Sequence, residues 1–174
     1  SPNVGFNQLC PPFPECISES DIDSQDTSNC AEQPLCDEEL EVELWGVCYD
    51  IETTTALHLS SNQLTGEIPA ELGIMTNLTD IYLDDNQLTG EIPEEIGNLI
   101  NLQLLDLSGN QLTGEIPLTI INLTILEGLF LSSNQLSGEI HSEIGNMINL
   151  TELELGGNQL LGEIPEEIGN LINL

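Results

Sequence analysis

The sequence predicts an α/β-type solenoid, in which each coil of the chain adds one strand to a parallel β-sheet on the concave face of a right-handed superhelix. Two observations predict this fold. An Asn-Gln-Leu triplet returns every 24 residues, with its Asn at positions 62, 86, 110, 134 and 158. Before each triplet, apolar and polar residues alternate with the period of a short strand. Because one such unit cannot bury its own apolar face, the units must stack into one core.

The first part of each unit is predicted to be a half-buried strand. In the unit 78–101, Leu78, Ile81 and Leu83 point inward, and the residues between them are polar. Asn86 follows where the chain must bend, and its short amide can bond to backbone groups that the bend leaves unpaired. Stacked units therefore predict a ladder of asparagines.

The second part of each unit is predicted to turn and cross the far side. Gly90 provides a residue that accepts positive φ, and Pro93 fixes φ as the chain crosses. Ile92, Ile96 and Leu99 point inward and close the core. Successive coils are then about 4.8 Å apart, the spacing of neighbouring strands.

The chain divides into three regions. An acidic arm rich in Cys and Pro covers 1–35, a cap covers 36–53, and repeats cover 54–174. The five repeat units span 54–77, 78–101, 102–125, 126–149 and 150–173, and a sixth begins at Leu174. Three residues depart from the repeat: Ile121 replaces a Gly, His141 a Pro and Leu161 a Thr. We expect the third and fourth units to bend differently.

All five cysteines lie before position 49, at Cys10, Cys16, Cys30, Cys36 and Cys48. Cysteines gathered at one end of a solenoid predict a disulfide-stapled cap that covers the first coil. Such bridges need an oxidising compartment, so we expect the chain outside the cell. An odd number leaves one thiol, which can bond to a neighbouring molecule.

The chain holds 31 Asp and Glu residues and neither Lys nor Arg, which gives a net charge of −31. Binding to nucleic acid or to an anionic membrane surface depends on Lys and Arg. The composition therefore excludes both partners. Self-repulsion of this size favours a medium whose counter-ions screen it.

The repeats resemble the plant-type extracellular leucine-rich repeats, whose unit reads LxxLxLxxNxLtGxIPxxLgxLxxL. The segment Leu-Thr-Gly-Glu-Ile-Pro is intact at 64–69, 88–93 and 112–117, and the resemblance covers Thr54 to Leu174. It implies a secreted or surface protein that binds a protein, peptide or glycan. The segment 44–50 resembles the N-terminal cap of this family. The resemblance implies a Cys36–Cys48 bridge, with two of the other three cysteines paired and one available to another molecule.

The centre of each predicted strand contributes one residue to a column on the concave face, where the family commonly contacts ligands. This column, together with the neighbouring Asp84, gives the candidate ligand-binding residues: His58, Tyr82, Asp84, Asp106, Phe130 and Glu154. Mixed aromatic and acidic side chains suit a basic or sugar partner. Many small neighbours, such as Ser60 and Gly156, leave a passive surface as the alternative.

A second column consists of acidic residues in one phase: Glu67, Glu91, Glu115, Glu139 and Glu163. Calcium takes several oxygen ligands at once, so this column is a candidate calcium site, helped by Glu71, Glu95, Glu143 and Glu167. The alternative is a solvated acidic edge. No other cofactor is expected.

Catalysis is not expected, because His58 and His141 occupy different phases of the repeat and the chain has no Lys or Arg to act on an anion. Three N-glycosylation sequons begin at Asn77, Asn122 and Asn149. The repeat itself accounts for asparagine at these phases, which weakens that interpretation.

Two functions remain. The first is a structural subunit that associates with copies of itself, end to end, in a surface assembly or filament. Near-identical repeats and the uncovered last coil favour it. The second is a ligand-binding ectodomain that recognises a protein, peptide or glycan through its concave face. The varied central column favours it.

Overall fold

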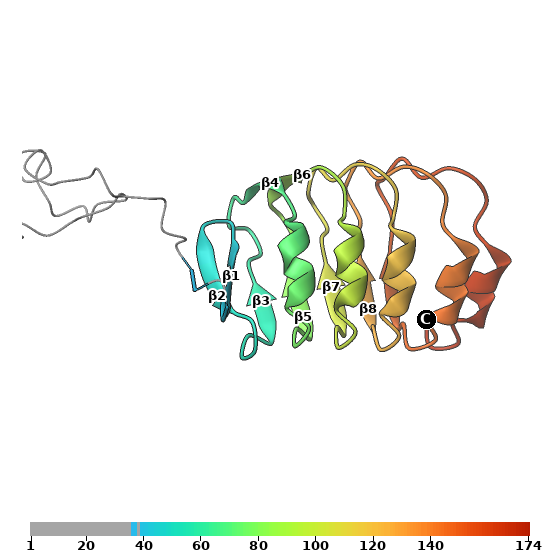
Figure 1. Ribbon diagram of the computed structural model, residues 1–174. Helices are drawn as coiled ribbons and strands as arrows, with labels where there is room; N and C mark the ends of the chain where they lie inside the picture. Colours follow the sequence, from blue (N-terminus) through green and yellow to red (C-terminus); the bar gives the residue numbers. More distant parts are fainter. Residues whose placement is uncertain (1–35, 38) are drawn as a thin grey trace, which may run out of the picture. The chain divides into compact units, whose positions relative to one another are not determined.

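The computed structural model describes residues 36–37 and 39–174, which belong to one compact unit, Cys36–Leu174. The predicted arm at 1–35, with Cys10, Cys16 and Cys30, lies outside the described residues. Within the unit, the chain runs through a series of stacked coils, each with a strand and a short helix (Figure 1).

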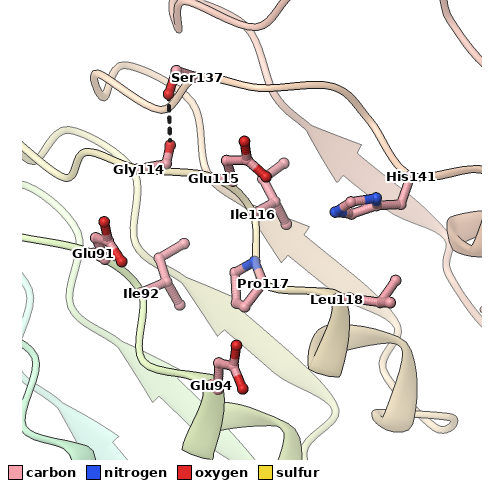
Figure 2. A pocket seen from close by; sticks show the side chains of 10 residues that line it. All are labelled: Glu91, Ile92, Glu94, Gly114, Glu115, Ile116, Pro117, Leu118, Ser137 and His141. Carbon is pink, nitrogen blue, oxygen red and sulfur yellow. Dashed lines mark hydrogen bonds between the residues drawn. The ribbon is translucent and has the colours of Figure 1, made fainter.

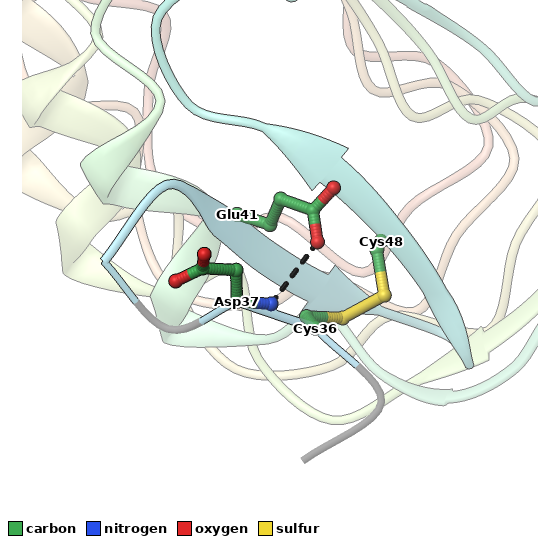
Figure 3. Close-up of a disulfide and its surroundings, with 4 residues drawn as sticks. All are labelled: Cys36, Asp37, Glu41 and Cys48. Carbon is green, nitrogen blue, oxygen red and sulfur yellow. Dashed lines mark hydrogen bonds between the residues drawn. A yellow bond between two sulfur atoms is a disulfide. The ribbon is translucent and has the colours of Figure 1, made fainter.

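A β-hairpin opens the unit. Strands β1 (Glu41–Leu44) and β2 (Val47–Asp50) pair antiparallel. Trp45 and Gly46 connect them and both have positive φ, 48° and 79°, as a two-residue hairpin loop requires. A disulfide joins Cys36 to Cys48 with Cα atoms 5.4 Å apart (Figure 3). The stapled cap and the bridge implied by the resemblance are both present.

Hydrogen bonds fix both ends of this cap. The amide of Asp37 donates to Glu41 Oε2 at 3.0 Å, beside the disulfide (Figure 3). After β2, Asp50 Oδ1 accepts from the Thr53 hydroxyl at 2.8 Å and from the Thr53 amide at 2.7 Å. These bonds favour the carboxylate and lower the pKa of Asp50. The turn that they hold leads the chain into the first coil.

Five strands form the main parallel sheet, in sequence order: β3 (Ala56–His58), β5 (Asp80–Tyr82), β7 (Leu104–Asp106), β8 (Gly128–Phe130) and β9 (Glu152–Glu154). Their middle residues pair across the sheet and point into the core. A smaller parallel pair, β4 (Thr65–Glu67) and β6 (Gln87–Thr89), follows the asparagine turns. This is the sheet that the alternating pattern predicts.

The helical elements are short 3-10 turns rather than α-helices: η1 (Ala70–Ile74), η2 (Glu94–Asn98), η3 (Leu118–Asn122), η4 (Ser142–Asn146) and η5 (Glu166–Asn170). Each spans five residues, and a segment this short suits 3-10 hydrogen bonding, which is tighter than that of an α-helix. A Pro precedes four of them, and His141 precedes η4 in the same extended conformation. The substitution of His141 for Pro therefore leaves the turn intact.

The asparagine ladder is confirmed. Asn86, Asn110 and Asn134 are buried to 7% exposure. The amide of Asn110 donates to the carbonyls of Leu83 at 2.9 Å and Leu107 at 3.1 Å, and its Oδ1 accepts from the Leu88 amide at 3.0 Å. Each asparagine thus joins its own coil to the preceding one.

Glycines let successive 3-10 turns pack closely. A Cβ at Gly97 would come within 2.5 Å of the Thr119 carbonyl oxygen, and one at Gly145 within 2.4 Å of that of Glu167. Ile121 holds the equivalent place in η3, and the space between η3 and η4 is wider than between the other turns (Figure 1). The expected difference between the third and fourth units is present, and the side chain of Ile121 explains it.

Candidate functional site

The outward side chains of β3, β5, β7, β8 and β9, which we call the sheet face, contain the predicted ligand-binding column. Strand register pairs His58 with Tyr82, Tyr82 with Asp106, Asp106 with Phe130 and Phe130 with Glu154. All five are exposed or half-buried. The fold therefore brings these five residues into one row, about 4.8 Å apart per strand.

Contacts within the sheet face orient its side chains. The rings of His58 and Tyr82 stack with centroids 5.1 Å apart and planes at 18°. The Ser108 hydroxyl donates to Asp106 Oδ1 at 2.6 Å. Asp84 lies in the adjacent row, where it accepts from the Ser60 hydroxyl at 2.5 Å. A partner would meet side chains that are already ordered, which lowers the entropic cost of binding.

A second row runs beside the first, and the sequence did not predict the hollow within it. Register aligns Ala56, Asp80, Leu104, Gly128 and Glu152. At Gly128 the row has no side chain, and a shallow hollow of about 160 Å³ is lined by Leu104, Phe130 and the acidic residues around them. A glycine inside a predicted strand is the signal that could have found it.

The glutamate ladder lies away from the sheet face. Glu67, Glu91 and Glu115 are exposed and line two open grooves between the coils, of about 730 and 640 Å³. Figure 2 shows the second groove, where the Ser137 hydroxyl donates to the Gly114 carbonyl at 3.2 Å. His141 also lines it, with its ring directed toward the apolar side chains of the groove (Figure 2). His58 and His141 thus lie in different places.

The ladder does not gather carboxylates into a cluster. Among the described residues, the one group of three donors whose atoms lie within 4.8 Å of one another is Cys36, Glu41 and Cys48. Its two sulfurs form the disulfide, so neither is a thiolate that could bind a metal. Calcium at the glutamates of the ladder, Glu139 and Glu163 included, stays a prediction.

The three sequons differ in their surroundings. Asn77 Nδ2 donates to the Glu52 carbonyl at 2.8 Å, and Asn149 Nδ2 donates to the Thr124 carbonyl at 2.7 Å. Asn122 is exposed at the last position of η3. Two of the three asparagines thus have a structural role in joining coils, and glycosylation at any of them stays a prediction.

A family model for leucine-rich repeat regions matches residues 54–174. The chain belongs to the leucine-rich repeat family. Comparison with curated proteins gives no match.

Solved structures of Arabidopsis proteins show the same fold. A chain of the complex of BIR3 and SERK2 is 41% identical, with a TM-score of 0.62, and the match covers 73% of this chain and 65% of that one. The ectodomain of the membrane receptor kinase GASSHO1/SCHENGEN3, in complex with CASPARIAN STRIP INTEGRITY FACTOR 2, is 41% identical, with a TM-score of 0.68. That match covers 70% of this chain and 15% of that one.

The receptor kinase HAESA, solved with the peptide hormone IDA and the co-receptor SERK1, is 40% identical, with a TM-score of 0.68. The match covers 70% of this chain and 21% of that one. The chain thus spans between 15% and 65% of the lengths of these three. In the described residues, every helix is too short or too polar to cross a membrane. The chain is of the extracellular or cell-surface class, like the receptor ectodomains that it resembles.

Proposed function

We propose that the chain is a non-catalytic, extracellular binding module that recognises a peptide or protein through its sheet face. The observation that carries the proposal is the row His58, Tyr82, Asp106, Phe130 and Glu154, in which aromatic and acidic side chains stand side by side on an accessible sheet. Aromatic side chains are the residues that most often dominate binding energy at protein interfaces.

The comparisons support binding over end-to-end assembly. Two similar structures hold named partners: HAESA is solved with a peptide hormone and a co-receptor, and GASSHO1/SCHENGEN3 with an integrity factor. These partners belong to those proteins, and this chain covers a small part of each. The sheet face offers an accessible surface for a partner here, whereas self-association and glycan binding receive no support from the comparisons.

Catalysis is left out of the proposal for a physical reason. The sheet face contains carboxylates, hydroxyls and His58, but its side chains include no cation to stabilise a developing negative charge. The imidazole of His58 stacks on the ring of Tyr82. The arrangement suits contact and orientation, not bond cleavage.

Selection from a phage-displayed library of random peptides tests the proposal. Selected peptides are measured against the native chain and against a double variant, Tyr82→Ala with Asp106→Ala. We expect this variant to weaken binding about tenfold or more, because it removes an aromatic contact and a charge from the centre of the row.

The matched control is Glu94→Ala with Glu95→Ala, two exposed residues on η2. This control should stay within about twofold of the native affinity, as expected for residues outside an interface. Peptides that lose affinity with the η2 variant and not with the sheet variant would disprove the proposal. Thermal unfolding of both variants checks that each is folded.

A further inference from the structure

The hollow beside Phe130 has a feature that the rest of the sheet face lacks. Gly128 is buried although it stands at an outward position of β8. A Cβ at this residue would come within 2.8 Å of Phe130 Cε2 and 3.6 Å of Leu104 Cγ. The aromatic ring therefore leans over the backbone of its own strand and occupies the space that a side chain would fill.

This geometry gives the hollow an apolar and aromatic lining. Leu104 and Phe130 contribute apolar side chains, and Gln103 and Thr151 also line the hollow. The π face of an aromatic ring is negative and attracts a cation within about 6 Å of the ring centre.

The remaining lining residues are acidic. Asp80, Glu127 and Glu152 come from the second, fourth and fifth coils and line the hollow together with the apolar residues. Asp80 Oδ2 accepts from the Thr79 hydroxyl at 2.7 Å, which orients that carboxylate. No Lys or Arg exists anywhere in the chain to neutralise these groups. A positive charge that neutralises these carboxylates must therefore come from another molecule.

We propose that this hollow is a specificity pocket for an arginine side chain of a basic peptide or of a basic segment of a partner protein. The proposal rests on the proposed function of the sheet face and names the chemistry of its partner. A guanidinium is planar, stacks on an aromatic ring and pairs with carboxylates through several N–H donors at once. A lysine ammonium offers neither the plane nor the fork.

The test uses two labelled synthetic peptides, one of alternating Arg and Ser residues and one in which citrulline replaces every Arg. Citrulline keeps the shape of arginine and removes its charge. Fluorescence anisotropy measures the affinity of the whole chain for both at physiological ionic strength. We expect the arginine peptide to bind about tenfold or more tightly than the citrulline peptide, because the citrulline peptide lacks the charge-assisted contacts.

Two variants locate the site. Gly128→Ala displaces the Phe130 ring without changing any charge, and we expect it to weaken the arginine peptide about fivefold, the worth of one aromatic contact. The triple variant Asp80→Asn, Glu127→Gln, Glu152→Gln removes three charges at the surface and should fold normally. It should weaken the arginine peptide about tenfold.

The matched control, Glu94→Gln with Glu95→Gln and Glu143→Gln, removes three charges on the 3-10 turns. Equal weakening by both triple variants would mean diffuse attraction to an acidic surface and would overturn the pocket.

The phage selection separates the two proposals. If selected peptides depend on Tyr82 and Asp106 but lack arginine and tolerate Gly128→Ala, the binding function stands and the arginine pocket fails.

Discussion

At the scale of single residues, the buried asparagines join each coil to its neighbours. Each buried amide satisfies carbonyls that a strand end leaves unpaired, and its oxygen accepts an amide from the coil before it. The residue type is decisive, because a side chain of this length must both donate and accept within a single turn.

Replacement of Asn110 by Ala should therefore cost stability. The change leaves the amide of Leu88 without its partner inside the core. The carbonyls of Leu83 and Leu107 each lose one of two asparagine donors and keep the bond from Asn86 or Asn134. We expect the free energy of unfolding to fall by about 2 kcal/mol, given a cost of roughly 1–3 kcal/mol for one buried group left without a partner. Urea denaturation followed by circular dichroism measures it.

Asn62 supplies the control for this measurement. It holds the same phase in the first coil, but it is exposed, and among the described residues its side chain donates to the Ser60 carbonyl alone. Asn62→Ala should change stability by less than about 0.5 kcal/mol, as is usual at exposed positions. Similar losses at both positions would contradict the role of burial.

Asparagine roles could be predicted from the sequence because they depend on one strand end and a fixed repeat. The lean of Phe130 could not, because it depends on the missing side chain of Gly128 and on Leu104 from the neighbouring coil. Likewise, the position of Glu152 next to Gly128 follows from sheet register, but the hollow between them needs side-chain positions. The sequence could thus predict which residues form the column on the sheet face, but not the hollow beside Phe130.

At the scale of elements, the 3-10 turns pack by close approach of backbones. Gly97 lies so near the Thr119 carbonyl that any side chain must push the next turn away. Ile121 shows the result within the same molecule, since η3 and η4 are further apart (Figure 1). The repeat pattern predicted this irregularity, because Ile121 stands where other units have Gly. The pattern did not predict 3-10 turns, which form because only a short segment of each coil is available for a helix.

Gly97→Ala should destabilise the chain by about 2 kcal/mol, since overpacking of a close contact usually costs about 1–3 kcal/mol. Gly169 holds the same place in η5, where nothing lies within 4 Å of an added Cβ. Gly169→Ala should therefore stay within about 0.5 kcal/mol of the native stability. Thermal denaturation of the pair compares them, and equal effects would rule out close packing as the cause.

At the scale of the whole molecule, the charge of −31 is uncompensated by any Lys or Arg. Exposed carboxylates repeat from coil to coil, so like charges face one another along the stack. The core and the asparagine ladder must outweigh this repulsion. Composition alone established the charge, and the repeat predicted the column of residues on the sheet face.

Salt should stabilise the chain. Raising NaCl from 0.01 to 1 M shortens the screening length from about 30 to about 3 Å, which weakens repulsion between carboxylates. We expect Tm at neutral pH to rise by several degrees, measured by circular dichroism. Near pH 4, where reference Asp and Glu groups are about half protonated, the rise should shrink. A Tm that falls with salt at neutral pH would contradict dominant self-repulsion.

The central claim is that the sheet face is where this leucine-rich repeat module meets its partner. Amide chemical-shift mapping by NMR, with the isotope-labelled chain and a phage-selected peptide, tests it most directly. We expect the largest shifts in β3, β5, β7, β8 and β9, around Tyr82, Asp106 and Phe130. Shifts gathered instead in η1 to η5, or in the grooves beside Glu91 and Glu115, would place the binding surface elsewhere and contradict the account.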